Sequence, residues 1–542
     1  MANIMSLKSL RNKTSRNGFD LSSKRNFTAK CGELLPVKTW EVLPGDSWSI
    51  DLRAFTRTQP LNTAAFARMR EYYDFYFVPY DLLWNKANTV LTQMYDNPQH
   101  ATSLIPSSDS LTGEMPYVTC EQIAKYLYNF SSEGTVGSKN NFFGYNRGLL
   151  SSKLLEYLGY GNFLVYANGA DWDSDPLASN LQMNVFGLLA YQKIYSDFIR
   201  ESQWEKCSPS TFNVDYMTGV GSMNISGISE PDFIEDYNMF DLRYCNWQKD
   251  LFHGVLPRQQ YGDVATVTAS IANPGTSTTS EFSILALRQA EFLQKWKEIT
   301  LSGDQDYADQ IEKHWNVSPG DGFSEKCTYL GGISSSLDIN EVVNNNITGD
   351  NAADIAGKGT GVSNGRLSFN SRGRYGLIMC IYHCLPLVDY TCDLVSPVYT
   401  KVNATDFAIP EFDRVGMESV PLSRLVNASS SVVPYDNQLL GYAPRYIDYK
   451  TDIDTSVGAF KSSLKNWVIS YNNDSVMSQF VNLPGQNPSI LYNYTSFKVN
   501  PNSVNPLFAV EVNSSVDTDN FLCTSFFDVK VVRNLDTDGL PY

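Results

Sequence analysis

The chain has 542 residues, of which 42% are hydrophobic and 18% charged, so it holds enough apolar material for a sizeable core and is not disordered throughout. It lacks the roughly eighteen consecutive apolar residues of a spanning helix, and its N-terminus has no apolar block of signal-peptide length, so we expect neither a membrane segment nor a standard export signal. Nine scattered cysteines exclude a disulfide framework and favour a reducing cytoplasm.

Charge is distributed unevenly along the chain, although the net charge of −16 argues against general affinity for nucleic acid. Residues 1–30 contain seven basic residues and one acid, Asp20, for a net charge of +6, so the remaining residues carry −22. We therefore predict a basic arm over residues 1–30 in front of an acidic body. The basic residues of this arm are Lys8, Arg11, Lys13, Arg16, Lys24, Arg25 and Lys30.

Strand-like patterns follow directly after the arm. From Cys31 to about residue 60, β-branched and aromatic residues alternate with polar ones, and Pro-Gly-Asp at 44–46 predicts a turn between two strands. Residues 70–85 read REYYDFYFVPYDLLWN and carry apolar side chains on both faces until Pro79 ends the strand. A strand that is apolar on both faces lies inside a sandwich or at a buried contact between subunits.

The apolar residues then recur with a helical period. We expect helices over 81–95, 120–130, 148–158 and 184–200, and two more over 281–300 and 304–314. Two polar, glycine-containing stretches, 272–280 and 344–365, predict long surface loops. Short strands return after residue 374, so the pattern indicates a mainly β protein with α insertions, whose antiparallel sandwich closes late in the chain.

Three short motifs resemble reactive sites, but each has a simpler explanation. The run CIYHC at 380–384 contains metal-ligand residue types within one apolar strand, so we expect packing cysteines and a hydrogen-bonded histidine. The run DWDSD at 171–175 does not complete a calcium loop and is interpreted as a solvated acidic loop, with a looser calcium site as the less favoured alternative. GKGTG at 357–361 lacks phosphate-loop spacing and is interpreted as a flexible linker. We find no catalytic constellation, and we predict no enzyme, metal or cofactor.

The basic arm is the charge feature with an evident partner. Its cations are separated by Ser, Asn and Thr, so they can lie against phosphates once the segment becomes ordered. A merely solubilising tail is the alternative, and the aromatic residues of the body could stack on unpaired bases but more often form the core. The predicted nucleic-acid-binding residues are Lys8, Arg11, Lys13, Arg16, Lys24 and Arg25.

Several longer segments carry a family resemblance in fixed order along nearly the whole chain. They begin with NFTAKCGELLPVKTWEV at residue 26 and include YYDFYFVPYDLLWN, AYQKIYSDFIRESQW and LRYCNWQKDLFHGVLPRQQYGD. The most specific is LRQAEFLQKWKEITLSGDQDYADQIEKHWNVSPGD, and PEFDRVGMESV and LGYAPRYIDYKTDIDTSVGAF follow it. Together they resemble the major capsid protein of the Microviridae, most closely its gokushovirus-like branch.

The chain departs from the gokushovirus pattern in one region. Only about eighteen residues separate Gly262 from Glu281, where those proteins carry a large insertion, so a prominent three-fold spike is not expected. Extra length near 105–180 and 205–235 is expected on the outward surface instead.

The resemblance implies a single eight-stranded antiparallel jelly roll with long helical and loop excursions. Residues 1–30 would face the interior as an arm, and residues 31–542 would form the capsid domain, with insertions at about 81–235 and 272–365. Pentamers and then sixty copies in a T=1 shell would enclose single-stranded DNA in the virion, after assembly in the host cytoplasm. A small basic DNA-condensing protein and other virion proteins would be partners. The alternative is a glycan-active or glycan-binding β-sandwich protein, suggested by the aromatics and carboxylates.

Overall fold

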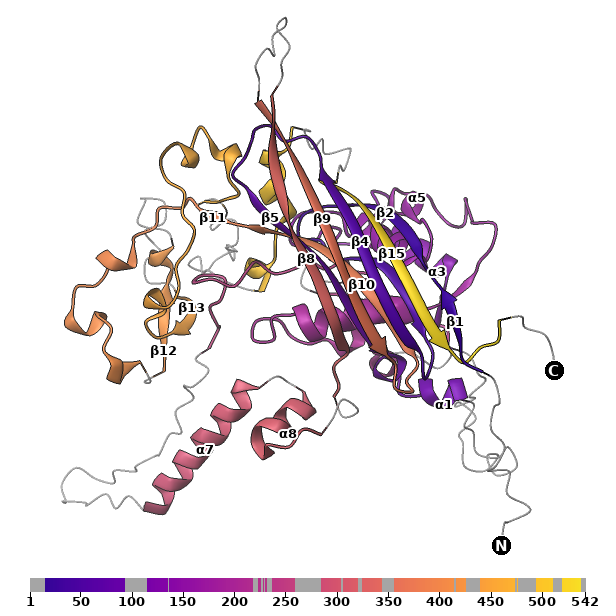
Figure 1. Cartoon of the computed structure of the whole chain (residues 1–542), viewed down its shortest axis with the longest axis horizontal. Coiled ribbons are helices and arrows are strands. Elements are labelled where there is room, and N and C mark those ends of the chain that lie inside the picture. Colours follow the sequence, from indigo (N-terminus) through magenta and orange to yellow (C-terminus); the bar gives the residue numbers. More distant parts are fainter. Residues whose placement is uncertain are drawn as a thin grey trace, which may run out of the picture.

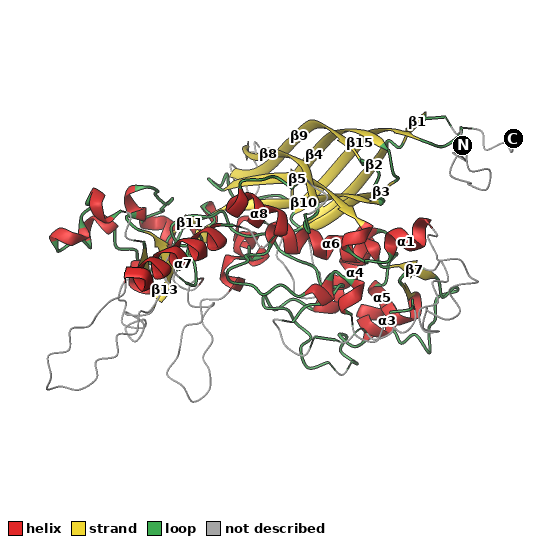
Figure 2. Cartoon of the chain, turned by 90° about the horizontal axis from the view of Figure 1, so that it is seen from below, coloured by secondary structure: helices red, strands yellow, loops and turns green. Residues whose placement is uncertain are grey.

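A computed structural model of the chain shows a mainly β protein built around one curled antiparallel sheet, with helices packed on one side of it (Figures 1 and 2). Among the described residues, no helix is long and apolar enough to cross a bilayer. The structure describes residues 15–92, 115–134, 136–217, 223–225, 228, 230–231, 236–258, 284–303, 306–319, 324–343, 355–413, 416–425, 439–472, 475, 494–509 and 519–537.

The main sheet has nine strands in the order β1-β15-β4-β9-β8-β5-β10-β3, with β2 also paired to β15. Neighbouring strands are antiparallel throughout. The strands predicted on either side of 44–46 and over 70–79 are confirmed as β3, β4 and β5. The strands are β1 (Asn17–Asp20), β2 (Ser23–Ala29), β3 (Leu35–Val42), β4 (Ser47–Thr58), β5 (Arg68–Pro79), β8 (Thr328–Val343), β9 (Ile355–Asn370), β10 (Gly376–Leu387) and β15 (Phe521–Arg533).

The long strand β8 turns the sheet back on itself. Its residues 328–337 pair with β5, whereas residues 338–343 pair with β9. The sheet therefore folds over at the point where β8 changes partner, and its two halves face each other. Aromatic rings from both halves meet in the space between them. Trp40 on β3 packs edge-on against Phe527 on β15, with ring centroids 5.4 Å apart. The main core therefore lies inside the curl of the sheet, and most of its buried residues are apolar.

Strand β9 corrects the sequence prediction. The surface loop predicted over 344–365 is wrong for residues 355–365, which begin β9, while 344–354 lie outside the described residues. The GKGTG motif is thus part of a strand and not a flexible linker. A Cβ at Gly361 would lie 2.6 Å from Leu337 Cδ2, and a Cβ at Gly365 would lie 2.6 Å from Ile333 Cγ1. Side chains of the opposing strand fill this space, so a loop-like composition builds a packed strand.

Helices cover the outer face of the half-sheet that contains β3, β10 and β5 (Figure 2). Every predicted helical stretch contains a helix, although the first is short. The helices are α1 (Ala87–Thr92), α3 (Cys120–Tyr128), α4 (Arg147–Leu158), α5 (Leu164–Ala167), α6 (Phe186–Ile194), which continues as a π-helical turn (Tyr195–Ile199), α7 (Ile284–Ser302) and α8 (Tyr307–Trp315).

The helical layer explains why β5 is apolar on both faces. On one face, Phe75 points into the main core, where its ring lies near that of Trp40. On the other face, Tyr76 contacts Phe198 of the α6 extension, and Tyr80, just after the strand, stacks on Phe186 of α6 at 4.5 Å. The aromatic stretch is buried within one copy of the chain, between the curled sheet and the helices.

A smaller cluster of short elements lies beside the main sheet, in orange at the left of Figure 1. Here β11 (Asp389–Tyr390) pairs with β14 (Ser470–Tyr471), and β12 (Met417–Pro421) pairs with β13 (Leu439–Pro444). These strands enclose a second apolar core that includes Tyr390, Val420 and Leu440. The remaining pair, β6 (Tyr117–Thr119) and β7 (Gln182–Asn184), joins the helical layer.

Candidate functional site

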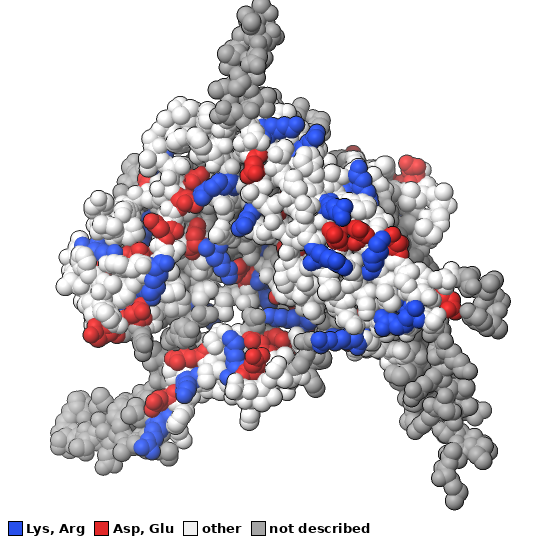
Figure 3. Space-filling model, in the orientation of Figure 1, with Lys and Arg blue, Asp and Glu red and all other residues white. Residues whose placement is uncertain are grey.

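The outward face of strands β2, β15, β4 and β9 carries a concentration of cations. Pairing places Lys24, Phe526, Arg53 and Asn364 in one row across the four strands. We call the outward basic residues of these strands the basic face, and Figure 3 shows several blue side chains over the area that β4, β9 and β15 occupy in Figure 1. The basic face consists of Lys24, Arg53, Arg57, Lys358, Arg366 and Lys530.

The basic face has a positive net charge, whereas the chain as a whole is negative. Its six cations share the surface with three acids, Asp20, Asp51 and Asp528, which leaves a net charge of +3 on a protein whose total is −16. Lys530 pairs with Asp20 and Asp528, and these contacts raise the pKa of Lys530. Arg53 lies 3.8 Å from Asp51, and the side chain of Arg53 is 62% exposed. Several cations therefore remain available to an external polyanion.

Apolar and aromatic side chains lie among these cations. Phe526 is 40% exposed and Val362 is 57% exposed, on strands that flank β4. The guanidinium of Arg57 lies over the ring of Phe55, 5.1 Å from its centroid. A surface of cations interleaved with exposed rings offers both phosphate contacts and stacking platforms, which is the combination that single-stranded nucleic acid binds.

The predicted arm residues meet different surroundings. Lys8, Arg11 and Lys13 lie outside the described residues. Arg16 donates to the carbonyl oxygens of Gly45 and Val532 at the end of the sheet, and Lys24 is exposed on the basic face.

Arg25 faces the opposite way from Lys24. It donates to the Tyr157 carbonyl oxygen at 2.8 Å, and burial lowers its pKa. Arg25 and Lys24 both belong to strand β2, which pairs with β15, as does strand β1 before it.

Sequence reasoning missed Arg53, Arg57, Lys358, Arg366 and Lys530. These residues come from three segments hundreds of positions apart, so no local run of charge marks them. The available signal was the alternation within each strand: every second residue of β4 is buried, which places Arg53 and Arg57 together on the outer face. Pairing of β4 with β15 and β9 could not be inferred from one sequence.

The other candidate motifs lie away from the basic face. Cys380 and Cys384 are fully buried, which confirms the expectation of packing cysteines. His383 stacks on Tyr72 with ring centroids 4.9 Å apart, and burial lowers its pKa to about 4. The DWDSD run forms a turn in which Asp173 pairs with Lys125. Among the described residues, no group of three or more His, Cys, Asp or Glu side chains could hold a metal ion.

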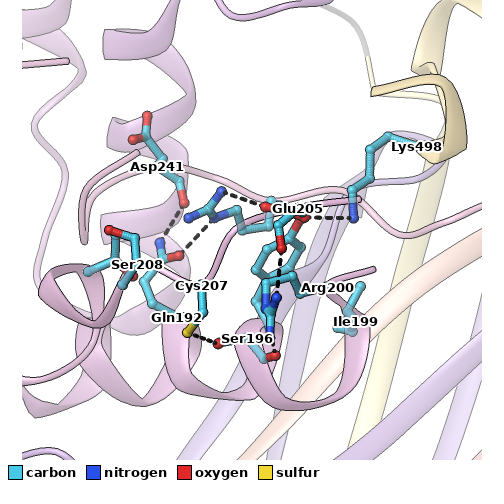
Figure 4. Close-up of polar contacts among 12 residues, drawn as sticks. Gln192, Ser196, Ile199, Arg200, Glu205, Cys207, Ser208, Asp241 and Lys498 are labelled. Atoms are coloured by element: carbon cyan, nitrogen blue, oxygen red, sulfur yellow. Dashed lines mark hydrogen bonds and ion pairs between the residues drawn. The ribbon is translucent and has the colours of Figure 1, made fainter. Parts of the chain in front are cut away.

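A cavity of about 920 Å³ lies beside α6, with both polar and apolar side chains in its lining, and polar side chains of its wall pair with one another (Figure 4). Arg243 in its wall lies over the ring of Tyr237 at 3.7 Å from the centroid, donates a hydrogen bond to Gln192 Oε1, and lies 3.9 Å from Glu205. Lys498 approaches the same carboxylate at 3.7 Å, and burial lowers the pKa of this ammonium. This network joins the middle of the chain to its C-terminal part, and we assign it a structural role.

Comparison with known proteins identifies the family. Residues 8–139 and 272–542 match the family described as capsid protein (F protein) of phages. The chain belongs to this phage capsid family. Capsid protein VP1 of Chlamydia phage 1 is 21% identical over 594 aligned residues, which cover 97% of this chain and 95% of the relative. Capsid protein VP1 of Bdellovibrio phage phiMH2K is 21% identical over 574 aligned residues, with the same coverage.

Membership in the capsid family confirms the resemblance to Microviridae capsid proteins and favours the capsid prediction over a glycan-active or glycan-binding sandwich. As a phage capsid protein, the chain belongs in the virion. Both matched segments contain strands of the main sheet. Residues 140–271, which hold α4, α5, α6 and most of the cavity wall, lie between the two segments that match the family, whereas the alignments with both VP1 proteins cover 97% of the chain.

Proposed function

We propose that this capsid protein assembles into a T=1 icosahedral shell of sixty copies around a single-stranded DNA genome. The order of the strands supports a single eight-stranded jelly roll: β2-β15-β4-β9 in one half of the sheet and β3-β10-β5-β8 in the other. That order places strands from both ends of the chain side by side in each half, as two interleaved Greek keys do. Strand β1 and the long excursions are additions to this roll.

Family membership is the single observation that carries the shell function. The test is to express the full chain and examine it by size-exclusion chromatography and negative-stain microscopy. We expect pentamers and uniform spherical particles. A folded protein that elutes near its monomer mass of 60.8 kDa under all assembly conditions would contradict this function.

The basic arm, together with the basic face, is proposed to contact the packaged DNA. The arm residues are Lys8, Arg11, Lys13, Arg16, Lys24 and Arg25, and the support for this assignment is the net positive charge of both surfaces in an otherwise acidic protein. Alanine replacement of all six arm residues should lower packaged DNA or particle yield, more steeply at raised salt. Particles with an unchanged DNA content would remove the arm from this role.

The remaining features of the proposal follow from the shell function. The protein would act structurally, without a catalytic step or cofactor, and would assemble in the host cytoplasm. A small basic DNA-condensing protein and other virion proteins would share the interior and the shell, and residues 1–30 would face that interior. Because DNA condensation would be shared, the contacts of this chain with DNA need only be weak and independent of sequence.

A further inference from the structure

Helix α7 and its partner α8 form a pair that the rest of the described chain leaves largely uncovered. None of residues 288–303 is buried, and no residue of α8 is buried. The two helices are held together mainly by polar contacts: Gln310 donates to the Thr300 carbonyl oxygen, and Lys313 donates to that of Ser302. Most helical stability in proteins comes from packing an apolar face, so a helix without such a contact lacks its main source of stability.

An apolar stripe runs along α7. Phe292 is 67% exposed and Trp296 is 56% exposed, and Ile299 follows at the same helical spacing. Arg288 and Lys295, both exposed, border this stripe on one side, whereas the acids of the helix lie farther around its circumference. The surface that α7 offers is therefore aromatic with a basic edge.

A second exposed apolar surface has the opposite charge. In residues 393–413, Val398 is 68% exposed, Tyr399 is 80% exposed and Val402 is 82% exposed. The cation of this segment, Lys401, turns inward to Asp448 and lies over the ring of Tyr449. Among its exposed acids, Asp393 pairs with Lys461 and Asp413 pairs with Lys450, while Glu411 leaves the edge of this apolar surface acidic.

Both surfaces lie on the same side of the molecule, opposite α3 and α5. Figure 1 shows α7 below the orange cluster that contains residues 393–413, while α3 and α5 lie at the other end of the sheet. A closed shell needs contacts in which one patch of a subunit meets a different patch of its neighbour. Two complementary patches on one chain, each still exposed, meet this requirement.

We propose that the apolar stripe of α7 docks on residues 393–413 of a neighbouring copy of this chain in the shell. This inference rests on the proposed shell function and names one of its subunit contacts. Trp296 and Phe292 would be buried against Val398, Tyr399 and Val402, because aromatic side chains dominate the energetics of such interfaces. Arg288 and Lys295 would face the acidic edge and fix the orientation of the contact.

Cross-linking between separate chains tests the contact directly. Of the nine cysteines only Cys207 is exposed, so a Cys207→Ser background leaves the surface free of thiols. In this background, chains carrying Gln289→Cys are mixed with chains carrying Thr400→Cys, two exposed positions beside the proposed anchors, then assembled and treated with a short bismaleimide. We expect cross-linked dimers in the mixture of the two chains and none with either chain alone.

The outcomes separate the inference from the shell function. Particles that assemble without cross-links between the two chains overturn the docking contact alone. A chain carrying both cysteines that cross-links only within itself also overturns it, because α7 would then be covered by its own chain. Failure of the unmodified chain to form any particles would overturn the shell function and the docking contact together.

A charge substitution gives a second measurement with a matched control. Trp296→Asp should lower particle yield at least tenfold while circular dichroism shows a folded subunit. Leu301→Asp places the same charge five residues later, on the far side of the same helix, and should assemble like the unmodified chain. Equal particle yields for Trp296→Asp and the unmodified chain would overturn the docking contact.

Discussion

Glu71 lies fully enclosed between the two halves of the main sheet. Its Oε1 accepts hydrogen bonds from the hydroxyls of Ser335 and Ser363, at 2.8 and 2.7 Å, while its Oε2 has no hydrogen-bond partner. No ion pair to a described residue balances this carboxylate. Burial of an unpaired charge is unfavourable, so Glu71 holds the halves together through its hydrogen bonds and not through its charge.

The effects of the hydrogen bonds and of the charge of Glu71 can be measured separately by substitution. Glu71→Gln keeps a carbonyl oxygen for the serines and removes the charge, so the free energy of unfolding should be unchanged or higher by on the order of 1 kcal/mol. Glu71→Leu removes the hydrogen bonds and should lower that free energy by about 1–3 kcal/mol. Urea unfolding of the subunit measures both. A Gln variant less stable than the Leu variant would disprove this account.

Asp74 and His383 respond to pH in opposite directions. Burial raises the pKa of Asp74 to about 6 despite a hydrogen bond from Tyr329, and burial lowers the pKa of His383 to about 4. Since an unfolded aspartate has a pKa near 4, the folded state takes up the Asp74 proton first, and stability is gained as pH falls through about 6. An unfolded histidine has a pKa near 6.5, so stability is lost through His383 as pH falls below that value.

Replacing either Asp74 or His383 should reveal how titration of the other residue changes the free energy of unfolding. From pH 7 to pH 5, Asp74→Asn should lose on the order of 1 kcal/mol of unfolding free energy relative to the unmodified chain. His383→Gln should gain a similar amount over the same interval. Denaturant unfolding at the two pH values measures these slopes, and parallel slopes for both variants and the unmodified chain would contradict the opposed titration.

At the scale of elements, the glycines of β9 set the distance between the halves of the sheet. Gly365→Ala would place a methyl group 2.6 Å from Ile333 Cγ1, and overpacking of this kind costs about 1–3 kcal/mol. Shortening the opposing side chain with Ile333→Ala should recover part of the stability. Gly18→Ala on β1 is the control, because no heavy atom lies within 4 Å of its added Cβ. Equal thermal stability of the Gly365 and Gly18 variants would show that β9 tolerates side chains.

Which elements could be predicted from sequence depends on where their packing partners lie. β5 and α6 carry long apolar patterns of their own, so their type was predictable and is confirmed. β9 has a loop-like composition because its glycines leave room for the side chains of Leu337 and Ile333 on β8. A local sequence pattern cannot reveal packing partners on another strand. The stripe on α7 was predictable as a helical face, but its exposure was not, because exposure depends on the surrounding fold.

The same reason limits what sequence says about the candidate site. The arm was visible because its charges are consecutive in the chain, and Lys24 lies on the basic face as well. The other members of that face become neighbours only through strand pairing.

At the scale of the whole molecule, the basic face should make DNA binding dependent on salt. Each phosphate contact with a single strand contributes about 0.7 to the slope of log affinity against log salt, so Arg53→Ala with Arg57→Ala should flatten that slope by about 1.4. Fluorescence anisotropy with an oligothymidylate at several salt concentrations measures the change. Lys206→Ala with Lys249→Ala removes two exposed cations elsewhere and should leave the slope unaltered. Equal slopes for the two double variants would remove the basic face from DNA binding.

The position of β15 has a consequence for how the protein is made. This strand, Phe521–Arg533, lies between β2 and β4, although more than four hundred residues separate it from them in the chain. At typical speeds of synthesis, a ribosome needs roughly 25–90 s to deliver β15 after β4 has emerged. During translation β4 keeps an open edge, and a prematurely terminated product keeps it permanently. Only a chain translated through β15 can therefore complete the surface that carries both Lys24 and Arg53.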